Sequence, residues 1–596
     1  MCGFVGIVRP GGLHPEDEEQ VRRATRALAH RGPDAQGIWI GSHMALGVAR
    51  LAVRGGQTAA QPLCVEGNGE MTPQAVLAFN GEIYDDSVSA RGTDGYDVTN
   101  GSSADTRWLA AHLGAHGLDC LADIDGMFAF AYWQPGRRRL FLARDRWGEK
   151  PLYWTRLPEG GLAFGSEPGA LIPVHGIDWA IEPRAVATFV GLGYWRGRGT
   201  PWSAVERLGA GQAIAWVDGV MNVTTWWSPQ AETFATVTVP PDTLGIYWHL
   251  TSAVGSRLVG ERPMGALLSG GLDSSLIVSL AADAGVRLPV WTVRWDNSGW
   301  DERVYAAAVG AHLGLEHRWV DFGPWDVPRR IEALVDAYGE PFGDESLLPT
   351  SAVLEAASSE VDVVLTGDGG DELFGGYDRY CWRPSAHVEY QDVFCACPRR
   401  VLHQVFVPEI LDDEESLPLR SAGRNIRDQR RWIDLHGYLS DDLPRKMDRA
   451  AGRVGIENRA PFLARTLSRW AMTLSAEVLW WGDVGKQPLR ALAAKLLPSE
   501  IVRRGKLGFG VPLSPWFRGP LRSWVRDRLL SGTLVATGWI ESAGLERILQ
   551  DHFDGREHSR ALFNLLMLAI WLERWPRRLV DHPPPGTPSS LKVGRR

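Results

Sequence analysis

The sequence predicts a two-domain protein of mixed class, in which an antiparallel β-rich unit precedes an α/β unit with a parallel sheet. Two observations predict this organisation. Short apolar stretches recur between turn residues up to about residue 200, with only two helical patterns among them. From about residue 240 the pattern changes, and strand-like and helix-like segments alternate. Many strands with few helices favour stacked sheets, whereas regular alternation favours a parallel, doubly wound sheet.

The strand-like stretches of the first unit are apolar or alternate with a period of two, as strands with a buried face do. They read, in order, GFVGIV, MALGVARL, AVLAFNGEIY, GMFAFAYW, RRLFLARD and GLAFGSE. Two stretches with helical spacing interrupt them, EDEEQVRRATRALAH and SADTRWLAAHLGAHG. We therefore predict a first domain over residues 2–205 and a linker over residues 206–240.

The second unit opens with MGALLSGG, an apolar stretch that runs into glycines, and DSSLIVSLAADAG follows with the pattern of a helix. Further along, the apolar stretch VDVVL leads directly into TGDGGDE. Ligands bind at the carboxyl ends of the strands in doubly wound sheets, and both glycine-acid clusters follow such strands. We predict this domain over residues 241–580, mostly helical from 430 to 575. Residues 581–596 read as a disordered tail, since Pro, Gly and Ser dominate their first half.

Composition narrows the function classes. The chain has 596 residues, 44% of them hydrophobic and 22% charged, as is usual for a globular protein in water. A net charge of −8 without a basic block argues against a nucleic-acid partner. No apolar run reaches the length of about 18 residues that a membrane span needs, and Arg9 and Pro10 interrupt the apolar start. Six scattered cysteines form no disulfide framework, so we expect a cytoplasmic protein.

The stretch SGGLDSS, residues 269–275, indicates a phosphate or pyrophosphate cradle. Glycines after a buried strand let the chain turn tightly, so that successive backbone N–H groups face an anion. The next helix adds its positive N-terminal end, and serine hydroxyls add donors. A plain glycine turn would account for Gly270 and Gly271. It would not account for the polar residues crowded around them, which are Ser269, Asp273, Ser274 and Ser275.

Carboxylates gather near the same sheet edge. Asp273 belongs to the first cluster, and Asp368 and Asp371 belong to the second, GDGGDE. Mg²⁺ binds through a few protein oxygens together with nucleotide phosphates, so these acids form a candidate magnesium site. The alternative interpretation is a solvated acidic loop.

Three stretches, SGGLDSS, TGDGGDELFGGY and KMDRAAGRVGIENRAPF, resemble the synthetase domain of glutamine-dependent asparagine synthetases. The resemblance implies an adenine nucleotide α-hydrolase-like fold, whose loop holds pyrophosphate. It implies that ATP adenylates a carboxylate and that ammonia then displaces AMP.

The same resemblance implies roles for single residues. Asp273 and Asp371 would ligate Mg²⁺, and Lys506 would stabilise negative charge in the transition state. Asp368 stands where some relatives have Glu and would assist proton removal from the ammonium-like intermediate. The implied nucleotide contacts are Leu267, Ser269, Gly270, Gly271, Asp273, Ser274, Ser275, Val293, Gly367 and Asp368.

Cys2 follows the initiator Met1 directly. Removing Met1 would make Cys2 the first residue, and a free α-amine, with a pKa of roughly 7.7–8.0 in models, can serve as the base for the thiol. The thiolate could then attack a side-chain amide, form a thioester and release ammonia. The alternative is a small residue of no consequence at a frayed terminus.

Other residues offer what this chemistry needs. Asn80 and Gly81 can converge on a tetrahedral oxygen, Arg50 can clamp a carboxylate, and Asp105 can pair with an ammonium group. Taken singly, Asn80-Gly81 is also a hairpin turn, Arg50 a surface cation and Asp105 a helix N-cap.

Together with RGPD, GMFAFA and ARDRWGEKPLYW, these residues resemble a class II glutaminase domain. The resemblance implies an N-terminal nucleophile fold, a sandwich of two antiparallel sheets between helices, with a sheltered ammonia passage to the next domain. Cys2 would be the nucleophile, and Asn80 and Gly81 would form the oxyanion hole. Glutamine would bind to Arg50, Asn80, Glu82 and Asp105. Relatives that close β-lactam rings include some without this cysteine.

The sequence also departs from the family. FNGEIY runs into a long polar segment, DDSVSARGTDGYDVTNGSS, where relatives have a leucine-rich helix. In the synthetase half Ala451 replaces a serine, Gly452 a methionine and Ala464 an acid, which puts the identity of the acceptor in doubt.

We therefore predict an enzyme, a glutamine-hydrolysing asparagine synthetase that uses ATP, Mg²⁺, L-aspartate and L-glutamine. The first alternative is an amidotransferase of the same mechanism that acts on another carboxylate, such as a uronic acid or a natural-product precursor. A second is a non-catalytic relative that binds nucleotide or glutamine, and a third is a ring-closing synthetase, which would not need Cys2. A homodimer is the default expectation for such enzymes.

Overall fold

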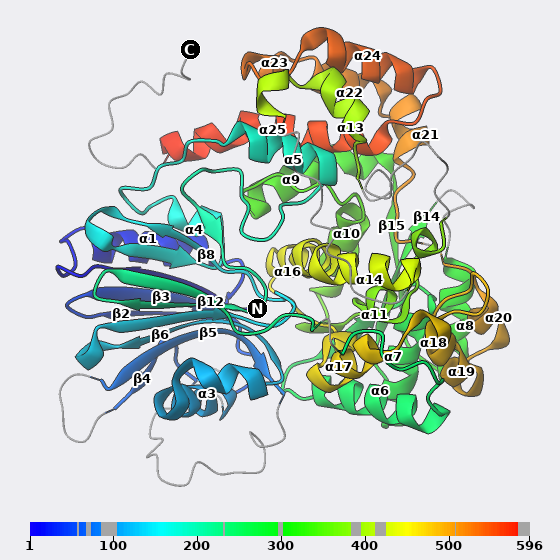
Figure 1. Ribbon diagram of the computed structural model, residues 1–596, viewed down its shortest axis with the longest axis horizontal. Helices are drawn as coiled ribbons and strands as arrows, with labels where there is room; N and C mark the ends of the chain where they lie inside the picture. Colours follow the sequence, from blue (N-terminus) through cyan, green and yellow to red (C-terminus); the bar gives the residue numbers. More distant parts are fainter. Residues whose placement is uncertain are drawn as a thin grey trace.

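The computed structural model describes residues 1–55, 59–66, 73–84, 104–230, 233–295, 302–382, 395–411, 425–506 and 508–581. Two stacked antiparallel sheets form one half of the molecule, and a parallel sheet surrounded by helices forms the other (Figure 1). The architecture confirms the predicted fold class. The predicted tail after residue 581 and the whole of the long polar segment after FNGEIY lie outside the described residues.

The first antiparallel sheet has the strand order β10-β8-β9-β1-β3-β2, with β1 (Gly3–Val8) among its central strands. Its other strands are β2 (Ala35–Ile40), β3 (Met44–Arg50), β8 (Tyr153–Arg156), β9 (Leu162–Gly165) and β10 (Glu206–Arg207). The second sheet has the order β12-β11-β7-β6-β5-β4. Its strands are β4 (Leu63–Val65), β5 (Ala75–Ile83), β6 (Gly126–Gln134), β7 (Arg139–Arg144), β11 (Gln212–Val217) and β12 (Val220–Thr225).

Alternation along each strand explains why its sequence is apolar throughout. In β1, Phe4 and Val8 pack into the core between the two sheets, whereas Val5 and Ile7 pack on the other side with α1 (Asp17–Ala27). The second sheet repeats this arrangement, since β5 and β6 place alternate residues against the first sheet and against α3 (Ala104–His116). Successive side chains of a strand point to opposite faces, and here both faces are covered. The layers therefore run helix, sheet, sheet, helix.

The structure corrects the predicted linker over residues 206–240. Part of it forms β11 and β12, which extend the second sheet through pairing of β11 with β7. Asp218 and Gly219, both at positive φ, make the tight turn between the two strands. An Asp-Gly pair between alternating apolar residues is a hairpin signal, and it identifies this hairpin from sequence.

The parallel sheet has the order β15-β14-β13-β16-β17. Its strands are β13 (Met264–Leu267), β14 (Val290–Trp295), β15 (His317–Phe322), β16 (Val363–Leu365) and β17 (Glu457–Arg459). The chain moves outward on one side of β13 and then returns to add β16 on the other side. The switch point between β13 and β16 is where such sheets bind ligands.

Helices cover both faces and the far end of this sheet. Their bounds are α6 (Thr243–Arg257), α7 (Leu272–Asp283), α8 (Arg303–Leu313), α9 (Val327–Tyr338), α10 (Leu347–Ala357), α11 (Gly370–Phe374), α13 (Arg399–Val405), α14 (Ile426–His436), α15 (Tyr438–Asp441), α16 (Leu443–Gly452), α17 (Arg465–Thr473), α18 (Ala476–Leu479), α19 (Gln487–Leu496), α20 (Ser499–Arg503), α21 (Leu513–Arg518), α22 (Arg522–Leu529), α23 (Thr533–Ala536), α24 (Ser542–Phe553) and α25 (Ser559–Asp581). Two more, α4 (Pro168–Leu171) and α5 (Pro183–Leu192), belong to the first half. Within the described residues, no helix is both long and apolar enough to span a bilayer.

Buried ion pairs join the two halves through α16. Arg31 of the first half lies 2.9 Å from Asp448 of α16 and 2.8 Å from Glu167. Glu167 in turn lies 2.9 Å from Arg449, also in α16. All four side chains are buried, so each charge depends on its partner across the interface.

Candidate active sites

Cys2 lies at the start of β1, half-buried, and its Sγ is 3.7 Å from the carbonyl oxygen of Leu51. Burial raises the pKa of the thiol, although the N-terminal amine and Arg50 oppose the shift. Met1 precedes it with a buried side chain, whose sulfur lies 3.1 Å from Lys150 Nζ. Burial also lowers the pKa of the Met1 α-amine to about 6. An amine in this place is therefore mostly unprotonated at neutral pH.

Asn80 and Gly81 lie next to each other on β5, in the sheet stacked on the one that holds β1. Asn80 is fully buried, and neither atom of its side-chain amide has a hydrogen-bond partner among the described residues. A buried amide without a partner is costly unless a ligand completes it. Gly81 has a φ of +153°, and a Cβ there would lie 2.0 Å from the carbonyl oxygen of Met127, so only glycine fits.

Arg50, Glu82 and Asp105 are buried in the same half of the molecule. Arg50 Nη2 donates to the carbonyl oxygen of Arg54 at 2.8 Å, and Asp105 Oδ1 accepts from the Thr106 N–H at 2.7 Å. Burial and the neighbouring Asp105 raise the pKa of Glu82 well above its usual range. Glu82 and Asp105 repel each other when both are charged, so this pair of buried acids favours a cation between them.

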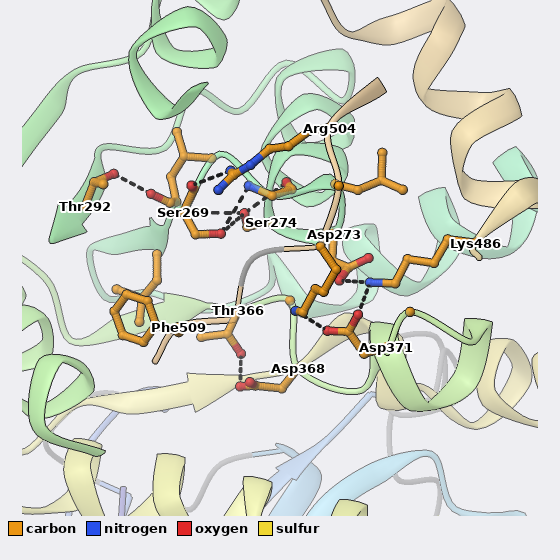
Figure 2. Close-up of a pocket in the computed structure, with 18 of the residues that line it drawn as sticks. Ser269, Asp273, Ser274, Thr292, Thr366, Asp368, Asp371, Lys486, Arg504 and Phe509 are labelled. Atoms are coloured by element: carbon orange, nitrogen blue, oxygen red, sulfur yellow. Dashed lines mark hydrogen bonds and ion pairs between the residues drawn. The ribbon is translucent and has the colours of Figure 1, made fainter. Parts of the chain in front are cut away.

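The second site is a cavity of about 300 Å³ at the carboxyl ends of β13, β14 and β16 (Figure 2). It lies at the switch point of the sheet. Predicted residues that line it are Leu267, Ser269, Gly271, Asp273, Ser274, Val293, Gly367, Asp368, Asp371 and Lys506. Gly270 and Ser275 do not line it. Gly270 instead makes the turn at a φ of +69°, where a Cβ would lie 2.4 Å from the Ala306 nitrogen, and Ser275 is fully buried in α7.

Hydrogen bonds from its own serines fix the SGGLDSS loop. The Gly271 N–H donates to Ser269 Oγ at 3.2 Å, and the hydroxyls of Ser269 and Ser274 are 3.1 Å apart. Arg504 Nη1 donates to the carbonyl oxygen of Ser269 at 3.2 Å and so places a cation beside the loop. Because α7 begins at Leu272, its positive end meets the same space.

Lysines alternate with carboxylates on the opposite wall, and Figure 2 shows Lys486 between Asp273 and Asp371. Lys486 Nζ is ion-paired with Asp273 and lies 2.6 Å from Asp371 Oδ1, while Lys506 Nζ lies 2.6 Å from Asp371 Oδ2. Burial would raise the pKa of Asp371, but the two lysines hold it well below its usual range. The wall therefore carries fixed charges of both signs.

Asp368 also lines this cavity. Thr366 Oγ1 donates to Asp368 Oδ2 at 2.7 Å, and burial raises the pKa of this carboxyl while Lys446 opposes the shift. Lys446 is held by Asp344 Oδ2 at 2.9 Å and by Ser346 Oγ at 2.8 Å. A carboxyl with a raised pKa at a reaction site is suited to accept and release a proton.

The lining side chains that the sequence prediction missed include Lys446, Lys486, Arg504 and Phe509. Two of them had a usable signal, because Arg504 and Phe509 flank the predicted Lys506 in RRGKLGF. Lys446 had a signal too, as the first residue of KMDRAAGRVGIENRAPF, whereas Lys486 lies outside every motif and only the fold brings it to the cavity.

A much smaller cavity, of about 10 Å³, lies between the two halves. Its lining includes Glu149 and Lys150 from the first half and Asp368, Asp448 and Asn458 from the second. Asp368 therefore faces both the nucleotide-side cavity and the interface between the halves.

The three departures from the family do not line the larger cavity. Ala451 and Ala464 are buried in apolar clusters. At Gly452 a Cβ would lie 2.9 Å from Arg31 Nη1 and 3.4 Å from Met1 Cε, at the interface between the halves. Of the three, Gly452 is thus the one shown against residues of the first half.

Comparison with known proteins also divides the chain into two parts. Residues 246–573 match the asparagine synthase family, and residues 1–227 match a glutamine amidotransferase domain. The chain is 26% identical to asparagine synthetase [glutamine-hydrolyzing] 1 of Bacillus subtilis, over 96% of each chain. It is 26% identical to asparagine synthetase B of Escherichia coli, over 85% of this chain and 82% of that one. It is also 28% identical to amidase chry2 of Gibberella zeae, over 94% and 96% of the two chains.

Proposed function

Because the chain belongs to the asparagine synthase family, with a glutamine amidotransferase domain before the synthase domain, we propose that it is a glutamine-dependent asparagine synthetase. The overall reaction converts ATP, L-aspartate and L-glutamine into AMP, pyrophosphate, L-asparagine and L-glutamate. The observation that carries the proposal is the pairing of two sites in one chain. One site contains Cys2, near the start of the chain, and the buried amide of Asn80, which has no hydrogen-bond partner among the described residues. The other contains the SGGLDSS loop beside lysines.

In the first site, Cys2 acts as the nucleophile once Met1 is removed. Its α-amine takes the thiol proton. The sulfur attacks the side-chain amide carbon of glutamine, and the amide of Asn80 and the N–H of Gly81 stabilise the negative oxygen. The α-amine passes this proton to the amide nitrogen, so that ammonia leaves as the thioester forms, and water then releases glutamate from Cys2.

Glutamine is held by its charged end. Arg50 pairs with the α-carboxylate, and the buried acids Glu82 and Asp105 receive the α-ammonium group. The raised pKa of Glu82 supports this assignment, because a cation placed there relieves the repulsion between the two acids.

In the second site, the acceptor carboxylate attacks the α-phosphate of ATP and pyrophosphate leaves. Ser269, Gly271 and Ser274 hold the departing phosphates with the positive end of α7, and Lys506 stabilises the charge that develops on them. Ammonia then attacks the acyl carbon, AMP leaves, and Asp368 accepts the proton that the new C–N bond releases.

Asp273 and Asp371 would hold Mg²⁺. Both supply carboxylate oxygens at the cavity wall, and Asp273 Oδ1 has no hydrogen-bond partner among the described residues, so the donor set fits a hard cation. When bound, the ion would neutralise phosphate charge. Lys486 now neutralises both carboxylates, so it would have to share them with the cation.

Aspartate is the proposed acceptor because the two asparagine synthetases above match 96% and 85% of this chain. A second candidate is the amidation of another carboxylate, and the amidase-named relative, which matches over a similar length, favours it. A homodimer and a cytoplasmic location stay predictions from the sequence.

The test is pyrophosphate exchange into ATP with a panel of carboxylic acids, using the full-length protein. We expect exchange that depends on aspartate. Exchange with a different acid alone would support the second candidate, and no exchange with any acid would contradict an ATP-dependent amidotransferase.

A further inference from the structure

Arg459 belongs to the synthase half but its side chain is directed toward the glutaminase half. It ends β17, a three-residue strand that pairs in parallel with β16 and is fully buried there. Nε donates to Glu457 Oε1 at 2.8 Å, and Nη1 donates to the carbonyl oxygen of Arg257 at 2.8 Å. These bonds fix the plane of the guanidinium from the synthase side.

The remaining nitrogen of Arg459 faces the other domain. Nη2 has no hydrogen-bond partner among the described residues, and it lies 3.8 Å from Glu82 Oε1. A further cation beside Glu82 is Arg54, whose Nε lies 3.2 Å from Oε2. Arg459 therefore supplies a second positive charge to Glu82 from outside the glutaminase domain.

The backbone of Arg459 connects to the nucleotide cavity. Its carbonyl oxygen accepts from the Thr366 N–H at 3.0 Å, and Thr366 Oγ1 donates to Asp368, which lines that cavity. One short strand thus contacts both sites, through its side chain on one side and its main chain on the other.

We propose that Arg459 is a positioning residue through which the synthase domain completes the glutamine-binding site, by placing a positive charge beside Glu82 that favours the carboxylate form, which receives the α-ammonium group of glutamine. The inference rests on the proposed function, because it takes Glu82 to bind glutamine. It gives the synthase domain a part in the affinity for glutamine.

The charges around Glu82 set the direction of the effect. Burial, Asp105 of α3 and Glu457 of β17 all disfavour the carboxylate, whereas Arg459 of β17 and Arg54 of the loop after β3 favour it, and the phenol of Tyr84 lies nearby. Removing Arg459 raises the pKa of Glu82 further. Glutamine binding is then lost at a higher pH than in the unmodified protein.

The experiment compares glutamine hydrolysis by full-length Arg459→Met, Arg459→Lys and Glu82→Gln over a range of pH. We expect Arg459→Met to raise KM for glutamine about tenfold, within the usual range for coupling between sites, with a much smaller change in kcat. The acid limb of its kcat/KM profile moves to higher pH. Arg459→Lys keeps the charge and recovers part of the KM.

The matched control is Arg465→Met, which removes another cation at the domain boundary, 3.4 Å from Asp123 and away from Glu82. It leaves KM for glutamine unchanged. In the double variant Arg459→Met with Glu82→Gln, KM equals that of Glu82→Gln alone, because the first substitution acts through Glu82.

An unchanged KM and pH profile in Arg459→Met, or additive effects in the double variant, would overturn the inference while the proposed function stands. If Arg459→Met does not fold, an unchanged KM in Glu82→Gln has the same force. Failure of the unmodified protein to hydrolyse glutamine would instead overturn the proposed function and the inference with it.

Discussion

The two candidate sites differ in how the charges of their side chains are balanced. In the nucleotide cavity Lys486 and Lys506 are paired with Asp273 and Asp371, so the wall is already balanced before a ligand enters. Around Glu82, burial and neighbouring acids leave a carboxyl whose charged form is disfavoured. The first arrangement suits a polyanion with its counterions, and the second suits a small ligand that brings its own ammonium group.

The sites also differ in how they are built. The nucleotide cavity takes most of its lining from loops that follow strands, and each loop is a continuous motif. The proposed glutaminase site takes single residues from β3, β5, the start of α3 and the position just before β1, which pairing and stacking of the sheets bring together. If the two sites are separate catalysts, damage to one spares the other.

The largest expected effect is at Lys506. We expect Lys506→Met to lower pyrophosphate exchange by about 10³-fold, because it removes a cation from the place where phosphate charge develops. Glutamine hydrolysis, followed as glutamate release, stays near its original rate. Lys495→Met, an exposed lysine of α19, is the control and changes neither activity. An equal loss of both activities in Lys506→Met would contradict the separation of the sites.

The converse test is Asn80→Ala. Removing one oxyanion-hole donor costs about 10²-fold in kcat, so glutamate release falls by that factor while pyrophosphate exchange continues. Asn222→Ala, an exposed asparagine on β12 of the same sheet, serves as the comparison. Glutamate release at the original rate would remove Asn80 from the mechanism.

A smaller effect is expected where the halves meet. Glu167→Gln removes a buried carboxylate that contacts Arg31 and Arg449, and we expect a loss of about 2 kcal/mol in the free energy of unfolding. The denaturant midpoint at pH 7 reports it, and Glu159→Gln, which is exposed, should not move the midpoint. A midpoint unchanged in Glu167→Gln would show that this interface adds little to stability.

The same carboxylate gives a pH dependence. Burial would raise the pKa of Glu167, but His30, Arg449 and Arg31 hold it well below its usual range. Its contribution is therefore present above the unfolded pKa, near 4.5, and is lost as pH falls through the lower folded value. The difference in midpoint between the original protein and Glu167→Gln should shrink below pH 4.5. A difference that grows in acid would contradict this account.

The same difference between the two sites explains how much of each could be predicted from the sequence. SGGLDSS and TGDGGDE predict the nucleotide-side cavity because their residues are contiguous and follow strands, and most of them line it. Lys486 lies outside these motifs, and the cavity acquires it through long-range packing. β17 has three residues, too few for any periodicity, so the link through Arg459 could not be predicted. The β11–β12 hairpin was missed although its Asp-Gly turn was readable.

The central claim is that the Cys2 thiolate releases ammonia from glutamine and that the second site consumes this ammonia. Synthesis of the amide product by Cys2→Ala tests it most directly, with glutamine or an ammonium salt as the nitrogen source and Cys64→Ala as the control. The account predicts that Cys2→Ala loses glutamine-driven synthesis and keeps ammonium-driven synthesis, while Cys64→Ala keeps both. Glutamine-driven synthesis that survives in Cys2→Ala would contradict the claim.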